Sequence, residues 1–201
     1  MRLENKVVII TGAGVGIGAA TARRMAEEGA SVVVAARRLK LLQDVVAQIE
    51  AAGGTATACA CDVTDEESVK QLVADTVAAY GKLDLVVNNA VLLVPGMLAS
   101  HSSKTWRQNF MVSLDGAMFL MREAYPQLKA NRGAVVNVSS VCGLLGSVGT
   151  AGYSAAKAGM IAMSRNAAIE WGKKGVRVNT VIPGAVSYTH LTLPTTKALG
   201  C

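Results

Sequence analysis

The sequence has few of the residues that mark metal-binding or disulfide-rich proteins. Its 201 residues include two histidines, His101 and His190, which lie far apart and suggest no metal site. The four cysteines are Cys59, Cys61, Cys142 and Cys201. They have neither zinc-ligand nor redox spacing. We interpret them as small buried hydrophobes in a reducing compartment.

Long hydrophobic runs are also missing. No apolar run reaches the roughly 18 residues that a membrane helix needs. The apolar part of the opening MRLENKVVIITG is too short for a signal peptide. We therefore expect a cytoplasmic protein without a membrane partner. The net charge of +6 comes from scattered Lys and Arg rather than a basic stripe interleaved with aromatics, so no nucleic-acid partner is predicted.

What the chain does have is a regular alternation of short β-branched runs with segments of helical periodicity. The predicted strands are Val7–Ile10, Ser31–Ala35, Thr55–Ala60, Leu85–Val87, Ala134–Val138 and Val176–Ile182. The predicted helices are Ile17–Glu28, Leu39–Ala52, Glu66–Tyr80, about 104–129, and Tyr153–Trp171. Continuously apolar strands are typical of a parallel sheet covered on both faces. The pattern predicts a doubly wound α/β fold with its ligand at the carboxyl ends of the strands.

A glycine-rich turn joins the first predicted strand to the first predicted helix. Gly12, Gly16, Ile17 and Gly18 follow the pattern T-G-x-x-x-G-x-G, in which Ile17 occupies the place of the last glycine of G-x-G-x-x-G. Such a turn lets the backbone and a helix N-terminus approach a pyrophosphate, so it predicts dinucleotide binding. A P-loop would need Gly-Lys-Ser/Thr at the helix start, where this chain has Gly18 followed by two alanines.

The end of the second predicted strand bears on the choice of cofactor. NAD sites, and the ribose sites of methyltransferases, tend to carry an acidic residue there, whereas this chain has Ala36, Arg37 and Arg38. A guanidinium suits a 2′-phosphate by charge and by its forked geometry. We therefore predict NADP(H) rather than NAD(H), with Arg37 as the phosphate contact and Arg38 as a helper.

Tyr153 and Lys157 lie four residues apart and share one face of a predicted helix. A tyrosine ordinarily titrates near pH 10, and a nearby ammonium stabilises the phenolate and lowers that pKa. The pair can then exchange protons with a carbonyl or alcohol near neutral pH. Alone, the Y-x-x-x-K spacing is also common on amphipathic helix surfaces.

From about residue 5 to 185 the chain resembles the short-chain dehydrogenase/reductase family of the classical type. The matching motifs, in family order and spacing, are Thr11–Gly18, Cys61–Val63, Asn88–Ala90, Ser139–Ser140, Tyr153 with Lys157, and Ile182–Gly184. The resemblance implies a Rossmann fold with strand order 3-2-1-4-5-6. It also implies hydride transfer between NADP(H) and a carbonyl or secondary alcohol, as in a 3-oxoacyl reductase or a similar enzyme.

The resemblance assigns a role to each matching residue. Tyr153 would be the general acid/base, Lys157 would hold the nicotinamide ribose and lower the tyrosine pKa, and Ser140 would bond the substrate oxygen. Further cofactor contacts would come from Asp62, Val63, Asn89, Ala90, Pro183 and Gly184. Asp62 and Val63 would border the adenine, and Asn89 and Ala90 would line the cofactor cleft. Pro183 and Gly184 would pass near the nicotinamide. Family members commonly pair through the helices 104–129 and 153–171, which implies a homodimer or tetramer for the full-length protein.

The chain departs from the family at three places. Val91 stands where the family usually has glycine, which is expected to crowd the cleft or shift the loop. Ser113 occupies the position of the active-site Asn, seven residues after Trp106, whereas Asn109 is one turn early and should face elsewhere. Residues 187–201 resemble translated sequencing-adapter text, so we expect a native domain over 1–186, a non-native tail, and no seventh strand or substrate lid.

These departures leave two other interpretations open. The first is a cofactor-binding protein with impaired catalysis, and the second is a truncated fragment that does not fold stably. Turnover of a panel of carbonyl compounds separates an enzyme from the first, and cooperative thermal unfolding tests the second.

The Ser113 difference generates a prediction. In the family the Asn supports a water-mediated proton relay to the lysine, and the backbone carbonyl of Ser113 can sustain a weakened relay. We expect reduced rather than abolished turnover, and an increase in rate for Ser113→Asn in a full-length chain. An unchanged or lower rate in steady-state assays would show that this account of the position is wrong.

Overall fold

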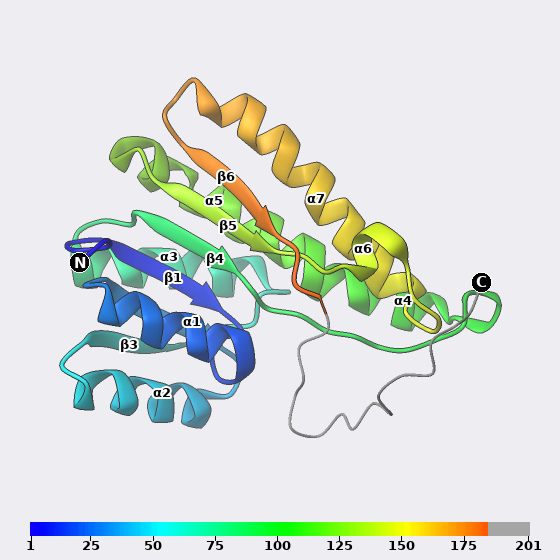
Figure 1. Cartoon of the computed structure of the whole chain (residues 1–201), viewed down its shortest axis with the longest axis horizontal. Coiled ribbons are helices and arrows are strands. Elements are labelled where there is room, and N and C mark those ends of the chain that lie inside the picture. Colours follow the sequence, from blue (N-terminus) through cyan, green and yellow to red (C-terminus); the bar gives the residue numbers. More distant parts are fainter. Residues whose placement is uncertain (185–201) are drawn as a thin grey trace.

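Six parallel strands form one sheet in a computed structural model that describes residues 1–184. The strands are β1 (Val7–Thr11), β2 (Ser31–Ala36), β3 (Thr55–Ala60), β4 (Leu85–Asn88), β5 (Ala134–Val138) and β6 (Arg177–Val181). Their spatial order is β3-β2-β1-β4-β5-β6, which confirms the predicted order (Figure 1). The predicted tail at 187–201 lies outside the described residues.

The helices differ from the prediction at three places. They are α1 (Gly16–Glu27), α2 (Leu39–Ala51), α3 (Glu66–Tyr80), α4 (Ser103–Phe110), α5 (Gly116–Asn131), α6 (Cys142–Leu145) and α7 (Ala151–Gly172). The helix predicted over about 104–129 is divided into α4 and α5 by a π-helical turn, η2 (Met111–Asp115). The short α6 and the 3-10 turn η1 (Leu98–Ser100) carry too few residues to show a hydrophobic period and were not predicted.

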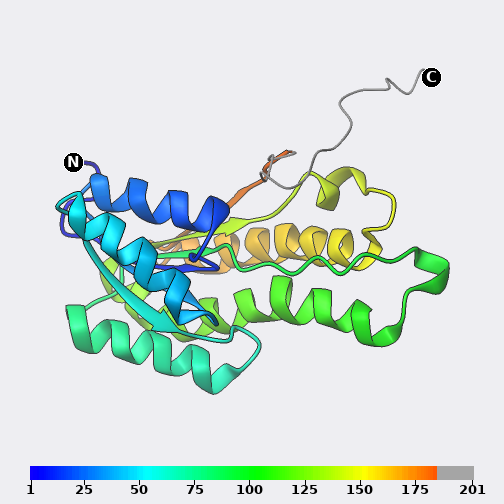
Figure 2. The same ribbon diagram turned by 90° about the horizontal axis from the view of Figure 1, so that it is seen from below.

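The sheet separates two apolar layers because successive strand side chains point to opposite faces. Val8 and Ile10 of β1 pack with Leu42 and other residues of α1 and α2. Ile9, between them, packs on the other face with residues of α3, α5 and α7, such as Leu72. Figure 2 shows the two groups of helices on opposite sides of the sheet. Within residues 1–184, no helix is long and apolar enough to cross a membrane.

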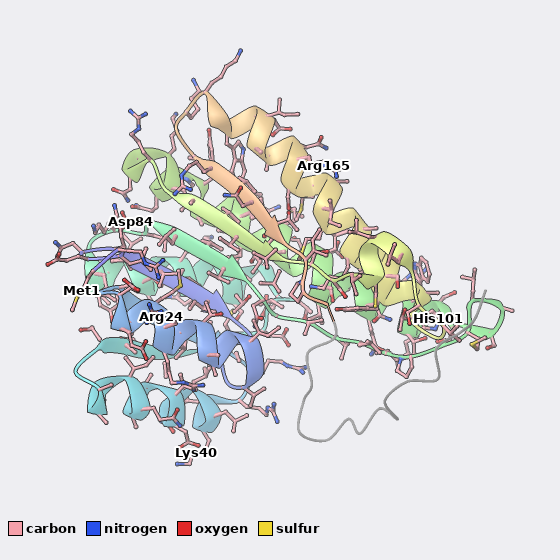
Figure 3. The ribbon with its side chains drawn as sticks, in the orientation of Figure 1. Met1, Arg24, Lys40, Asp84, His101 and Arg165 are labelled. Atoms are coloured by element: carbon pink, nitrogen blue, oxygen red, sulfur yellow. The ribbon has the colours of Figure 1, made fainter. Side chains whose placement is uncertain are left out.

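Asp84 joins the amino-terminal ends of β1 and β4. The residue is 3% exposed, and its carboxylate accepts hydrogen bonds from Val7 N at 2.9 Å and Lys6 Nζ at 3.2 Å. Burial alone would raise the pKa of Asp84, but these donors and the Lys82 ammonium lower it below its ordinary value. Asp84, labelled in Figure 3, thus holds the strands together at their amino-terminal ends. The candidate site lies at the opposite, carboxyl-terminal ends of the strands.

Candidate active site and nucleotide cleft

The glycine turn after β1 needs glycine for two separate reasons. Gly12 and Gly16 have φ angles of +64° and +58°, in the left-handed region that other residues rarely adopt. Gly18 has no room for a side chain, because a Cβ there would lie 2.5 Å from Asn89 Nδ2 and 2.5 Å from Gly12 O. The turn is therefore shaped by its own backbone and by the segment after β4.

Asn89 and Ala90 hold the glycine turn in place. Asn89 Nδ2 donates to Thr11 O at 2.9 Å and to Gly12 O at 3.1 Å. The backbone N–H groups of Asn89 and Ala90 both donate to Thr11 Oγ1 at 3.1 Å. Two motifs that are 78 residues apart in the chain thus form one hydrogen-bonded unit.

A cavity of about 210 Å³ lies at the carboxyl ends of β1, β2, β3 and β4. Its lining includes the predicted cofactor residues Gly12, Ile17, Arg37, Asp62, Val63, Asn89 and Ala90. Arg37 and Arg38, both exposed, lie on its wall at the end of β2. Among the described residues, no side chain caps the N-terminus of α1, and its first turn holds no acidic residue. The N–H groups at the start of α1 are therefore suited to an anion.

Asp62 lines this cavity while its carboxylate is already engaged locally. Its Oδ1 accepts from Thr64 N at 3.0 Å and from Thr64 Oγ1 at 2.8 Å. The backbone N–H of Asp62 donates to Ser68 Oγ of α3 at 3.1 Å. These bonds fix the loop after β3, so that Asp62 and Val63 present a preformed wall rather than a mobile one.

A second cavity, of about 120 Å³, contains the predicted reaction centre. Its lining residues are Ile17, Asn89, Val91, Val138, Ser139, Ser140, Tyr153, Lys157, Pro183 and Gly184. Ile17, Asn89 and Val91 also line the first cavity, so the two spaces adjoin. The structure therefore brings Ser140, Tyr153 and Lys157 together with Pro183 and Gly184, next to the glycine turn.

Lys157 is almost completely buried, with 2% of its surface exposed. Its Nζ donates to the Val138 carbonyl at 2.6 Å and lies 5.9 Å from the centre of the Tyr153 ring. Burial lowers the pKa of Lys157 to about 8, because the charged form loses solvation. The ammonium group is thus held by the backbone of β5 on one side and faces the tyrosine on the other.

A chain of buried amides and hydroxyls holds α7 against the sheet. Asn88 Nδ2 donates to Asn137 Oδ1 at 2.8 Å, and Asn137 Nδ2 donates to Ser164 Oγ at 2.8 Å. Ser139 Oγ donates to the Lys157 carbonyl at 2.9 Å. No role was predicted for Asn137, although a polar residue between Val136 and Val138 of an apolar strand indicates a buried hydrogen bond.

Ser140 is placed at the rim of the second cavity by the turn into α6. Its Oγ accepts a hydrogen bond from Cys142 N at 3.2 Å. That bond uses the hydroxyl as an acceptor and leaves its proton available to be donated. The group can therefore donate to an oxygen in the cavity, which is the function expected of it.

Ser113 and Asn109 both bond the segment that follows β4. Ser113 is fully buried in η2, and its Oγ contacts Leu92 N and Leu92 O, both at 3.4 Å. It does not line either cavity. Asn109, which was expected to face elsewhere, lines neither cavity; it is also fully buried and bonds Val94 of the same segment. Residues four apart share a helix face, so both side chains reach this segment.

Comparison with known proteins gives a consistent result. A family model described as short chain dehydrogenase matches residues 6–199. The 2,5-dichloro-2,5-cyclohexadiene-1,4-diol dehydrogenase LinX of Sphingobium indicum is 40% identical over 187 residues, which are 92% of this chain and 75% of that protein. The 3-oxoacyl-acyl-carrier-protein reductase FabG of Thermotoga maritima is 37% identical, over 92% of this chain and 76% of that protein. A crystal structure of a short chain dehydrogenase from Mycobacterium smegmatis has a TM-score of 0.88 at 37% identity, covering 92% of this chain and 79% of that one.

The buried Lys157 should make the stability of the protein depend on pH. Because its pKa in the folded chain is about 8 and its ordinary value is 10.5, the unfolded chain binds the extra proton between these limits. The free energy of unfolding should therefore rise with pH from 8 to 10.5, by up to about 3 kcal/mol. Denaturant unfolding across this range should show that increment in the original chain and its loss in Lys157→Met. Lys174→Met, at an exposed lysine, should keep it; an equal slope in the original chain and in Lys157→Met would contradict the burial argument.

Proposed function

This chain belongs to the short-chain dehydrogenase family, and from that membership we propose that it is an NADP-dependent enzyme whose acid/base residue is Tyr153. The family assignment makes it an oxidoreductase acting on CH–OH and C=O groups with a nicotinamide cofactor. What carries the proposal for this chain is the junction of the two cavities. There the glycine turn, which suits a pyrophosphate, adjoins the pocket of Ser140, Tyr153 and Lys157.

In the proposed site, different residues bind the substrate and transfer the proton. When bound, the nicotinamide supplies or accepts the hydride. In the proposed mechanism the Tyr153 hydroxyl gives a proton to the substrate oxygen during reduction and takes it back during oxidation. Ser140 donates a hydrogen bond to the same oxygen and fixes its position. Lys157 places a positive charge near the Tyr153 ring and so favours the phenolate form, which makes the tyrosine a usable base near neutral pH.

We propose a carbonyl or secondary alcohol as the substrate, as for a 3-oxoacyl reductase or a similar enzyme. Two named relatives support this class: one is a cyclic diol dehydrogenase and the other a 3-oxoacyl reductase. Both names imply the interconversion of an alcohol and a carbonyl group. The alternative is a cofactor-binding protein with impaired catalysis. The one observation in its favour is Ser113 at the family Asn position.

The NADP preference is proposed from Arg37. Fluorescence titration of the 201-residue chain should give a lower Kd for NADPH than for NADH. Arg37→Ala should raise the Kd for NADPH by about 10-fold to 100-fold, because a charged hydrogen bond to the 2′-phosphate is lost, while the Kd for NADH stays the same. Arg165→Ala removes an exposed arginine of α7 and should change neither value. Tighter binding of NADH by the original chain would overturn the Arg37 argument and leave the fold intact.

The catalytic proposal is tested at Tyr153. Tyr153→Phe keeps the ring and removes the hydroxyl, so turnover of an NADPH-dependent carbonyl panel should fall by about 100-fold or more while NADPH binding is retained. Tyr80→Phe is the matched control, because the Tyr80 hydroxyl bonds Thr57 on the β3 side of the sheet at 2.7 Å and should not affect turnover. If the original chain binds NADPH but turns over no compound of the panel, the impaired-catalysis alternative is correct.

A further inference from the structure

The connection between β4 and α4 contains an extended segment, residues 90–97, which we call the strap. Figure 1 shows it leaving the sheet after β4 and running toward the loop that precedes α7. Exposure alternates along it: Val91, Leu93 and Pro95 are exposed, and the residues between them are partly buried. This period of two is that of a β-strand, although the strap is not part of the six-stranded sheet. Its backbone must therefore find hydrogen bonds elsewhere.

The bonds are supplied at every second residue, by side chains of α4 and η2 at Leu92 and Val94 and by a backbone carbonyl at Gly96. Leu92 is contacted through both its N–H and its carbonyl by the Ser113 hydroxyl, at 3.4 Å each. Val94 N donates to Asn109 Oδ1 at 3.0 Å, and Asn109 Nδ2 donates back to Val94 O at 3.2 Å. Gly96 N donates to Gly149 O at 2.9 Å. The carboxamide of Asn109 thus presents one acceptor and one donor to Val94, as the backbone of a neighbouring strand would.

The strap touches both parts of the proposed site. Asn89, just before it, is bonded to the glycine turn. Val91 lines both the first cavity, which we call the nucleotide cavity, and the second, which we call the reaction cavity. At its other end Gly96 forms a bridge with Thr150, three residues before Tyr153. A displacement of the strap would therefore move a wall of the reaction cavity and the loop that leads into α7.

Asn109 is the tighter of the two clamps and also abuts α7. It is fully buried, and its Nδ2 makes a third bond, to Thr105 O at 3.0 Å. A Cβ on Gly152 would lie 3.0 Å from Asn109 Nδ2 and 2.9 Å from His101 Nε2, so both side chains pack against the residue before Tyr153. Figure 3 places His101 at the end of the molecule opposite Asp84. Ser113 has one proton to share and longer contacts, so it holds the strap less firmly.

We propose that Asn109 is a positioning residue for the reaction: its amide fixes the strap at Val94 and thereby sets the position of the Val91 wall and the approach of α7 to Tyr153. The inference rests on the proposed function, since it assigns Asn109 to the geometry of that site. Asn109 touches neither cavity and takes no part in proton transfer.

Kinetics of Asn109→Ala and Asn109→Asp in the 201-residue chain test the proposal. Small displacements remote from the chemistry lower rates strongly, so kcat should fall by about 10-fold to 100-fold in Asn109→Ala, with little change in KM. The Kd for NADPH should change less than about 2-fold, because Arg37 lies outside the strap and the glycine turn is held by its own bonds to Asn89. In Asn109→Asp the carboxylate still accepts from Val94 N but repels two carbonyls. Its kcat relative to the original chain should therefore recover as the pH falls and the carboxyl group gains a donor proton.

Gln108→Ala is the matched control, because Gln108 is an exposed amide on the same helix, and its kcat should be unchanged. An unchanged kcat in a folded Asn109→Ala would overturn the proposal. If Asn109→Ala does not fold, amide hydrogen exchange of the original chain decides the matter. Val94 N–H should be strongly protected, and exchange at the rate of an unstructured peptide would refute the clamp. Absence of turnover by the original chain, in contrast, would refute the proposed function through a separate measurement.

Discussion

The contact between the glycine turn and the Asn89–Ala90 segment is the constraint on which the rest of the site depends. Gly18 allows the Asn89 amide to approach the turn, and Asn89 then bonds the carbonyls of Thr11 and Gly12. Any side chain at Gly18 would separate the two segments. Because Asn89 and Val91 line both cavities, this one close approach fixes the floor of the nucleotide cleft and one wall of the reaction cavity. The glycine turn thus positions a neighbouring strand end, in addition to the phosphate group that we propose it binds.

Much of this arrangement could be predicted from local patterns. Short apolar and β-branched runs predicted all six strands. The family resemblance of the motifs predicted their order in the sheet. The predicted cofactor-binding residues lie close together, because the carboxyl ends of parallel strands meet at the same end of the sheet. The Tyr153–Lys157 spacing gave the shared helix face. In these cases the information is contained in a few neighbouring residues, so a single sequence was sufficient.

The remaining features depend on tertiary contacts that no local pattern reports. Ser113 was assigned by counting from Trp106, but the π-helical turn that accommodates it has no signal in the sequence MVSLD. Asn109 lies one turn before the expected position, and its bonds to the Val94 backbone were not predicted because backbone groups leave no residue-specific trace. The burial of Lys157 was likewise hidden, since a lysine in an amphipathic pattern is usually solvated. Each of these misses concerns a polar group whose partner is main chain.

The polar chain Asn88–Asn137–Ser164 has a consequence for the order in which the protein folds. Its bonds, together with those of Asn89, join residues between 27 and 78 positions apart. Contacts with such long loops form late, because loop-closure entropy must be overcome first. The reaction cavity is therefore complete only when β5 and α7 have docked onto the first half of the sheet, because Val138, Tyr153 and Lys157 line it. The residues that line the nucleotide cavity, in contrast, all lie between Gly12 and Val112, so a nascent amino-terminal half already carries that wall of the site.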